Sequence, residues 1–281
     1  MITGLKAVEI EGRRLEYYDI GAGPALVMMH GGLCSARDYE KILPRLSAQY
    51  RCILPDLLTG DERDPAQPWN VWLLLDHLGI RRAAIMGHSQ GGNFVHEMYR
   101  LTPDRVWAWV NIDCAATGAK IRSFKLRLSR YEPAMLQELQ RRKAARPNAP
   151  SYEWEPYFSA EGLAAMARFQ ERQWQHASGQ PLSEPGRPTP PATPIPSRPA
   201  PAPIPKAGKY IRCPLLHLNS GRGRLRQENI HPRWVQRYIN ATDVEYVVVT
   251  DSGHWIWLDQ TEAFLSAVLP FLKRHTPPVG G

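Results

Sequence analysis

The fold is decided by residues 83–94, which read AAIMGHSQGGNF. The stretch opens with an apolar run typical of a buried strand, passes through the motif Gly-X-Ser-X-Gly at 87–91, and continues in a helical pattern. A serine between a strand and a helix lies on a sharp, strained turn that raises its hydroxyl above the sheet. We expect glycine on both sides because a side chain there would collide with the neighbouring strand or helix. The arrangement predicts Ser89 as a nucleophile and the N–H of Gln90, at the positive end of the helix, as a donor to a developing oxyanion.

Length and composition restrict the class of protein. With 281 residues, of which 43% are hydrophobic, the chain suits one large α/β domain or such a core with one insertion. Its 4 cysteines lack CxxC spacing, which favours reduced thiols over a disulfide framework or a zinc site. The sequence does not begin with a basic region followed by an apolar run, and no apolar segment approaches the roughly 18 residues of a membrane span. We therefore expect a cytoplasmic protein that uses no membrane, metal or cofactor.

The positive charge of the chain does not indicate nucleic-acid binding. The formal net charge is +8, but much of the excess lies in residues 121–146, and no nucleic-acid motif accompanies it. This segment has a helical pattern, so we interpret its arginines as one solvated helix face, with selection of anionic substrates as the alternative. The expected partner is a small molecule, not a nucleic acid.

Strand and helix patterns alternate along two parts of the chain, 1–114 and 208–281. Such alternation predicts an α/β fold, with a mostly parallel twisted sheet flanked by helices and ligands bound at the carboxyl ends of the strands. The expected strands are 5–10, 13–18, 25–29, 51–55, 83–86, 106–112, 214–218 and 244–250, and the expected helices are 36–49, 69–78, the one ending near 101, 231–239 and 260–273.

The interval 115–207 differs from both parts and is expected to form a helical cap inserted into the core. Residues 121–146 and 159–176 have helical patterns. Residues 180–205 are rich in proline, which disfavours both helix and sheet, so we expect an extended, mobile loop that rejoins the cap to the core. A polyproline ligand for a partner protein is the alternative.

Three motifs together resemble those of the α/β-hydrolase superfamily. They are His30-Gly31-Gly32, the serine motif at 87–91, and Ser252-Gly253-His254, each at the end of an expected strand and in the family's order. The resemblance covers about 1–120 and 208–275 and does not extend to the cap. It implies the fold with more specificity than the substrate.

The family's mechanism implies a role for each of these motifs. Ser89 would attack a carbonyl carbon, and His254 would take its proton and pass it to the leaving group. The amides of Gly32 and Gln90 would bind the oxyanion. His30 is expected to orient the oxyanion loop, and the histidine at position 88 is expected to pack beside the elbow.

The acid of the triad is less clear, because this sequence departs from the usual pattern. In most of the superfamily an Asp follows the strand that is here 213–218, whereas this chain reads NSGRGRLRQE from 219 to 228, and Glu228 is the only carboxylate nearby. Asp113 leaves an apolar strand 24 positions after the nucleophile, and burying it would be costly without a partner such as His254. Haloalkane dehalogenases and the cofactor-free hydroxyquinolone dioxygenases resemble this chain in placing their acid there. We therefore predict Asp113 as the acid, with Glu228 as the alternative and a turn-capping role for Asp113 as the structural alternative.

Three functions fit these residues. The first is a serine hydrolase that cleaves a carboxylic ester, or less readily a lactone or amide, of a small apolar molecule. The second is a cofactor-independent dioxygenase in which a His254–Asp113 dyad deprotonates a heteroaromatic hydroxyl, although the position after the serine is Gln90 and not the second histidine of those enzymes. The third is a non-catalytic ligand-binding homologue. Dehalogenation is disfavoured because it needs a carboxylate where Ser89 stands.

Overall fold

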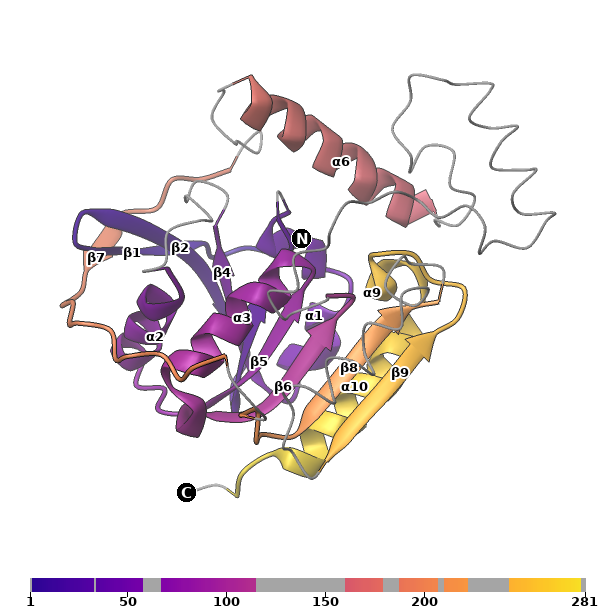
Figure 1. Ribbon diagram of the computed structural model, residues 1–281. Helices are drawn as coiled ribbons and strands as arrows, with labels where there is room; N and C mark the ends of the chain where they lie inside the picture. Colours follow the sequence, from indigo (N-terminus) through magenta and orange to yellow (C-terminus); the bar gives the residue numbers. More distant parts are fainter. Residues whose placement is uncertain are drawn as a thin grey trace.

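The computed structural model describes residues 2–32, 34–57, 67–114, 160–178, 187–206, 210–221 and 243–278. These residues form an α/β fold built on one large sheet with helices on both faces (Figure 1). The strands are β1 (Lys6–Ile10), β2 (Arg13–Ile20), β3 (Ala25–Met29), β4 (Arg51–Asp56), β5 (Ala83–His88), β6 (Val106–Ile112), β7 (Ala192–Pro194), β8 (Leu215–Ser220) and β9 (Val244–Val249). The helices are α1 (Leu43–Ser47), α2 (Gln67–His77), α3 (Gln90–Leu101), α6 (Ala160–Ala177), α9 (Ile256–Asp259) and α10 (Thr261–His275), with the 3-10 helices η1 (Ala36–Tyr39) and η2 (Pro103–Arg105).

The sheet brings the ends of the central strands to one edge. Its order is β7-β1-β2-β4-β3-β5-β6-β8-β9, and all pairs from β4 to β9 are parallel. The strands β3, β5, β6 and β8 are buried along their whole length, which explains their continuous apolar sequences. Because parallel strands point the same way, the residues that follow β3, β5, β6, β8 and β9 meet at the carboxyl edge. This confirms the predicted fold class.

Alternating side chains of the strands build a core on each face. On β3, Leu26 and Met28 pack with α1 and α10, whereas Val27 and Met29 pack with α2 and α3 on the opposite face. Figure 1 shows α6 at the top of the view, beyond the end of the sheet, and Ala165 of this helix packs against the core on the side of α1 and α10. Helix α6 therefore lies over the ends of the strands and not over either face of the sheet.

Two local predictions of helices need correction. The single helix expected over 36–49 is divided into η1 and α1, because Pro44 lies in the first turn of α1 and has no N–H to continue a ladder from η1. The short helix α9 between β9 and α10 was not expected, since four residues carry too little periodicity to indicate a helix.

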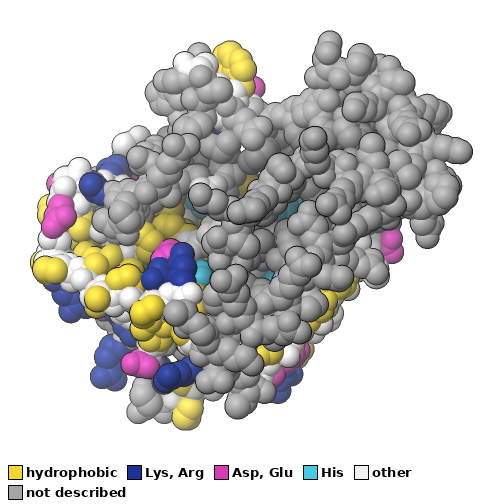
Figure 2. Space-filling view, in the orientation of Figure 1, with side chains coloured by type: hydrophobic (Ala, Val, Ile, Leu, Met, Phe, Trp, Pro, Cys, Tyr) yellow, Lys and Arg dark blue, Asp and Glu magenta, His cyan; other side chains and the backbone are white. Residues whose placement is uncertain are grey.

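The expectation that the proline-rich segment avoids the sheet is wrong. Residues 192–194 form β7, which pairs in parallel with β1, and the N–H of Ile195 donates to the carbonyl of Glu9 at 2.9 Å. Proline is compatible with this strand because β7 lies at the edge of the sheet, where one side of the backbone has no ladder to complete. Farther along, the carbonyl of Arg198 accepts from the Trp69 indole at 2.7 Å and that of Ile204 from Arg100 at 2.8 Å. The segment is extended, as expected, but hydrogen bonds tie it to the core. At the left of Figure 2 the described side chains are mainly hydrophobic, with Lys and Arg among them.

Other predictions fall wholly or partly outside the described residues. The helices expected over 121–146 and 231–239 lie outside them, whereas the helix expected over 159–176 is observed as α6. The division of the chain at 114 and 207 thus stays a prediction. None of the described helices combines the length and apolar character needed to cross a bilayer.

Candidate active site

Ser89 occupies a strained turn between β5 and α3. Its backbone has φ 51° and ψ −118°, a conformation that L residues rarely adopt, and its N–H donates to the carbonyl of Ile112 at 3.0 Å. A Cβ on Gly87 would lie 2.4 Å from the carbonyl oxygen of Gly91. A Cβ on Gly91 would lie 2.3 Å from the carbonyl oxygen of His30 and 2.4 Å from that of Met29. The predicted steric need for both glycines is confirmed.

The tight contact at Gly91 leads to a stability prediction. Gly91→Ala would press a methyl group against two carbonyls of the chain at the end of β3, which cannot move aside as a side chain can. We expect it to lower the free energy of unfolding by about 3 kcal/mol, the upper end of the usual range for overpacking. Urea denaturation measures this, with Asn93→Ala, an exposed position on the same helix, as the control. Equal midpoints for the two variants would contradict the close packing of the elbow.

His254 and Asp113 come together from the ends of two strands. The Nδ1 atom of His254, which follows β9, lies 2.6 Å from Oδ2 of Asp113, which follows β6. Asp113 is 4% exposed and has φ 43°, so its carboxylate is buried on a second strained turn. A buried carboxylate needs hydrogen-bond donors, and the imidazole supplies one. The arrangement leaves Nε2 as the nitrogen of His254 that faces away from the acid.

Ser220 supplies the other donors to Asp113 and was not singled out from the sequence. Both its N–H, at 3.0 Å, and its hydroxyl, at 2.8 Å, donate to Oδ1 of Asp113. Ser220 ends β8, next to where the superfamily usually places its acid. The pairing of Ile112 with Leu218 explains the contact, because β6 and β8 end side by side. The alternative acid, Glu228, lies outside the described residues.

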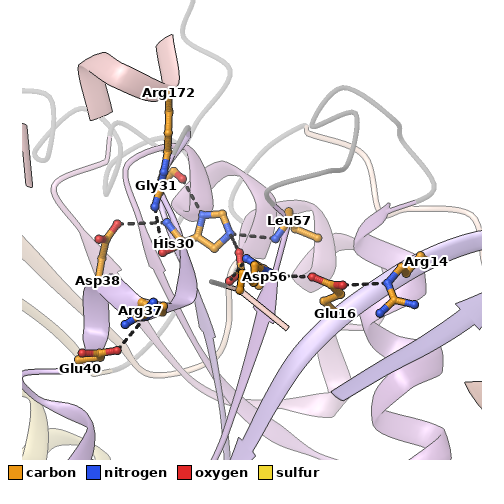
Figure 3. A network of polar contacts seen from close by, with 12 residues as sticks. Arg14, Glu16, His30, Gly31, Arg37, Asp38, Glu40, Asp56, Leu57 and Arg172 are labelled. Carbon is orange, nitrogen blue, oxygen red and sulfur yellow. Dashed lines mark hydrogen bonds and ion pairs between the residues drawn. The ribbon is translucent and has the colours of Figure 1, made fainter. Parts of the chain in front are cut away.

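The two residues that carry the predicted oxyanion donors are in contact. A Cβ on Gly32 would lie 2.0 Å from Oε1 of Gln90, so the side chain of Gln90 packs directly on the α carbon of Gly32. Gln90 is the first residue of α3, where backbone N–H groups have no acceptor within the helix. The carbonyl of Gly31 accepts from the N–H of Cys34 at 3.2 Å, and Nδ1 of His30 lies 2.7 Å from it (Figure 3). His30 thus contacts the loop that it was expected to orient.

His88 is buried beneath His254. Its Nε2 donates to the backbone carbonyl of His254 at 3.0 Å, and the two rings are 4.4 Å apart between centroids. Burial, followed by the nearby charges of His254 and His30, lowers the pKa of His88 well below its ordinary value, so that its ring stays neutral. The predicted packing role is confirmed. The contact also places the ring of His254 next to the residue that immediately precedes Ser89.

Donors and acceptors outside the triad fix the loop that carries His254. The N–H of Gly253 donates to Oδ2 of Asp259, on α9, at 2.6 Å, and the hydroxyl of Ser252 donates to the carbonyl of Val249 at 2.7 Å. The short helix α9 therefore holds the His254 loop in place through Asp259, a role that its sequence alone did not indicate.

Sequence relatives share parts of this chain. The model of the alpha/beta hydrolase fold family matches residues 24–261. The magnesium-chelatase 30 kDa subunit of Rhodobacter capsulatus is 37% identical over 90 residues, which are 29% of this chain and 32% of that protein. The soluble epoxide hydrolase of Corynebacterium sp. (strain C12) is 33% identical over 92 residues, 30% of this chain and 32% of its own. The matching regions span about a third of the length of these relatives.

Solved structures match over nearly the whole chain. Naproxen esterase (carboxylesterase NP) from Bacillus subtilis superposes with a TM-score of 0.63 at 17% identity, covering 96% of this chain and 91% of that one. The epoxide hydrolase CorEH superposes with a TM-score of 0.61 at 18% identity, covering 96% and 99%. At these identities the likeness concerns the fold. With the family model matching most of its length, the chain belongs to the alpha/beta hydrolase fold family.

Proposed function

We propose that this protein is a serine hydrolase that cleaves carboxylic esters of small apolar molecules through an acyl-enzyme. Ser89 is the nucleophile, His254 the general base and then acid, and Asp113 the group that orients the imidazole. The observation that carries the proposal is the contact of 2.6 Å between His254 and Asp113, together with the contact of His254 with His88, the residue before the strained Ser89. Esterases and epoxide hydrolases among the similar proteins support hydrolysis as the class of reaction.

The proposed reaction has two steps, acylation of Ser89 and deacylation by water, and the same groups act in both. As Ser89 Oγ bonds to the carbonyl carbon, its proton passes to Nε2 of His254, and the positive imidazole is stabilised by Asp113. The negative oxygen is bound by the N–H groups of Gly32 and Gln90. The proton then passes to the departing alcohol. Water repeats the sequence on the acyl-enzyme and releases the acid.

The acid position also favours a second candidate, a cofactor-independent dioxygenase. Asp113 lies after β6, and a His254–Asp113 pair can act as a base toward a heteroaromatic hydroxyl while Ser89 only binds. Oxygen uptake with a hydroxyquinolone as substrate measures this activity. We expect no uptake above the rate of the His254→Ala variant, which lacks the base of this mechanism, since Gln90 stands where those enzymes have a second histidine.

A small panel of substrates tests the proposal. We expect saturable hydrolysis of p-nitrophenyl acetate, with slower cleavage of a lactone, an anilide and an epoxide. Turnover of the epoxide alone would reassign the substrate class. An absence of turnover on the whole panel would favour the third candidate, a ligand-binding homologue without catalysis.

A further inference from the structure

Two buried carboxylates face each other across neighbouring strands, away from the triad. Glu16 on β2 and Asp56 on β4 are direct partners in the antiparallel ladder and are 7% and 2% exposed. Side chains of such partners lie on the same face, where like charges repel. Burial strengthens the repulsion, so the pair requires a cation between its members.

Arg187, from the proline-rich segment, provides that cation. Its Nη1 lies 3.0 Å from Oδ2 of Asp56, and its Nη2 donates to Oε2 of Glu16. Arg14 completes the arrangement, with Nε 2.8 Å from Oε1 of Glu16 and Nη2 donating to the carbonyl of Pro190. The guanidinium of Arg187 therefore bridges the two carboxylates with two of its nitrogens, and that of Arg14 adds a second positive charge beside Glu16.

Asp56 and its neighbour in turn contact His30. Oδ1 of Asp56 lies 3.5 Å from Nε2 of His30, and the N–H of Leu57 donates to the same nitrogen at 3.0 Å. Because Nε2 accepts this hydrogen bond, the proton of the neutral ring is on Nδ1. Nδ1 donates to the carbonyl of Gly31 at 2.7 Å, and Figure 3 shows His30 between Gly31 on one side and Leu57 and Asp56 on the other.

The carbonyl of Gly31 and the N–H of Gly32 belong to one peptide group. A planar trans peptide points these two groups in opposite directions, so a donor that fixes the carbonyl also fixes the N–H. The tautomer of His30 therefore sets the direction of the proposed oxyanion donor. A proton on Nε2 would displace the Leu57 hydrogen bond and draw the ring toward Asp56.

We propose that Arg187 is a positioning residue for the oxyanion site. By neutralising Asp56 and Glu16, it keeps His30 in the tautomer that aims the Gly32 N–H. These residues, Arg187, Glu16, Asp56 and His30, are called the Arg187 network. Through it, the proline-rich segment contributes to the orientation of the oxyanion donor. This inference rests on the proposed function for its kinetic consequence and on the structure alone for its effect on His30.

The kinetic test compares two arginines of the same segment. Arg187→Met is expected to lower kcat on p-nitrophenyl acetate by about 10- to 100-fold, below the loss seen when an oxyanion donor is removed outright, with KM changed less than about twofold. Arg187→Lys keeps the charge without the two-pronged contact and should recover part of the loss. The control is Arg198→Met, because Arg198 pairs with Asp76 at 2.6 Å and leaves His30 untouched. Equal kcat values for Arg187→Met and Arg198→Met would overturn the proposal.

A double-mutant cycle separates positioning from general destabilisation. If Arg187 acts through His30, then adding Arg187→Met to His30→Gln should cost no further activity. Multiplied losses of the two substitutions would show that Arg187 acts independently of His30 and would refute the proposal.

Nitrogen NMR of the imidazoles tests the structural part without any turnover. His30 is assigned by comparison with His30→Gln, and its wild-type spectrum should show a neutral ring protonated at Nδ1. In Arg187→Met we expect the Nε2 signal to move toward that of a protonated nitrogen, whereas Arg198→Met should leave it unchanged. An unmoved signal in Arg187→Met would refute the inference, while a moved signal in a protein without esterase activity would refute the proposed function only.

Discussion

Replacing Ser89 with alanine is expected to lower kcat for ester hydrolysis by about 10⁴-fold or more, because no other group at the elbow can form the acyl-enzyme. KM should change little, since the methyl group fills nearly the same space as the hydroxymethyl group. The matched control is Ser266→Ala, an exposed serine on α10 whose hydroxyl donates only to the carbonyl of Ala263, and its kcat should equal that of the wild type. A Ser89→Ala variant with more than a tenth of the wild-type rate would mean that another group is the nucleophile.

The same position predicts an opposite effect on stability. Ser89 has a positive φ of 51°, which strains the backbone of a residue with a side chain but which glycine adopts without strain. Ser89→Gly should therefore be inactive and yet raise the free energy of unfolding by about 1 kcal/mol relative to Ser89→Ala. Urea denaturation of the two variants measures the difference, and a less stable glycine variant would show that the turn is not strained.

The second large effect is expected at Asp113. Asp113→Asn keeps the size of the side chain and an acceptor for Ser220 but removes the charge that stabilises the protonated imidazole. It can also present an N–H to Nδ1 of His254 and so favour the wrong tautomer. We expect a loss of about 10⁴-fold in kcat, as for a triad acid replaced by its amide. Steady-state kinetics at saturating ester measure it.

Glu228→Gln serves as the matched control for Asp113→Asn, because it makes the same chemical change at the alternative acid. Its kcat should stay within about twofold of the wild type, the size of effect typical of a substitution away from the reacting groups. The reverse pattern, with Glu228→Gln inactive and Asp113→Asn active, would move the acid to Glu228 and leave Asp113 as a turn residue.

Much of the fold followed from local patterns. The apolar runs of β3, β5 and β6 and the glycines around Ser89 each express a steric or burial requirement that a sequence window contains. The choice of Asp113 came from the cost of burying a carboxylate that leaves an apolar strand. Its contact with His254 agrees with that reasoning.

The features that were not predicted depend on contacts between distant segments. Ser220 donates a hydrogen bond to Asp113 because β8 pairs with β6 in the sheet, and no local sequence pattern indicates which strands pair. The pairing of β7 with β1 joins residues more than 180 positions apart, and the guanidinium of Arg187 meets Asp56 across 131 positions. The prolines of residues 180–205 indicated a segment without backbone pairing to the sheet, whereas an edge strand such as β7 tolerates proline. Such contacts are products of the topology, which short-range periodicity does not determine.

The most direct measurement of the central claim is covalent labelling of the active protein with a fluorophosphonate, followed by peptide mass spectrometry. The account predicts one adduct per chain, on the peptide that contains Ser89, with loss of esterase activity in proportion to labelling. Full esterase activity in protein that is completely labelled on Ser89, or inactivation with the adduct on a different residue, would contradict it.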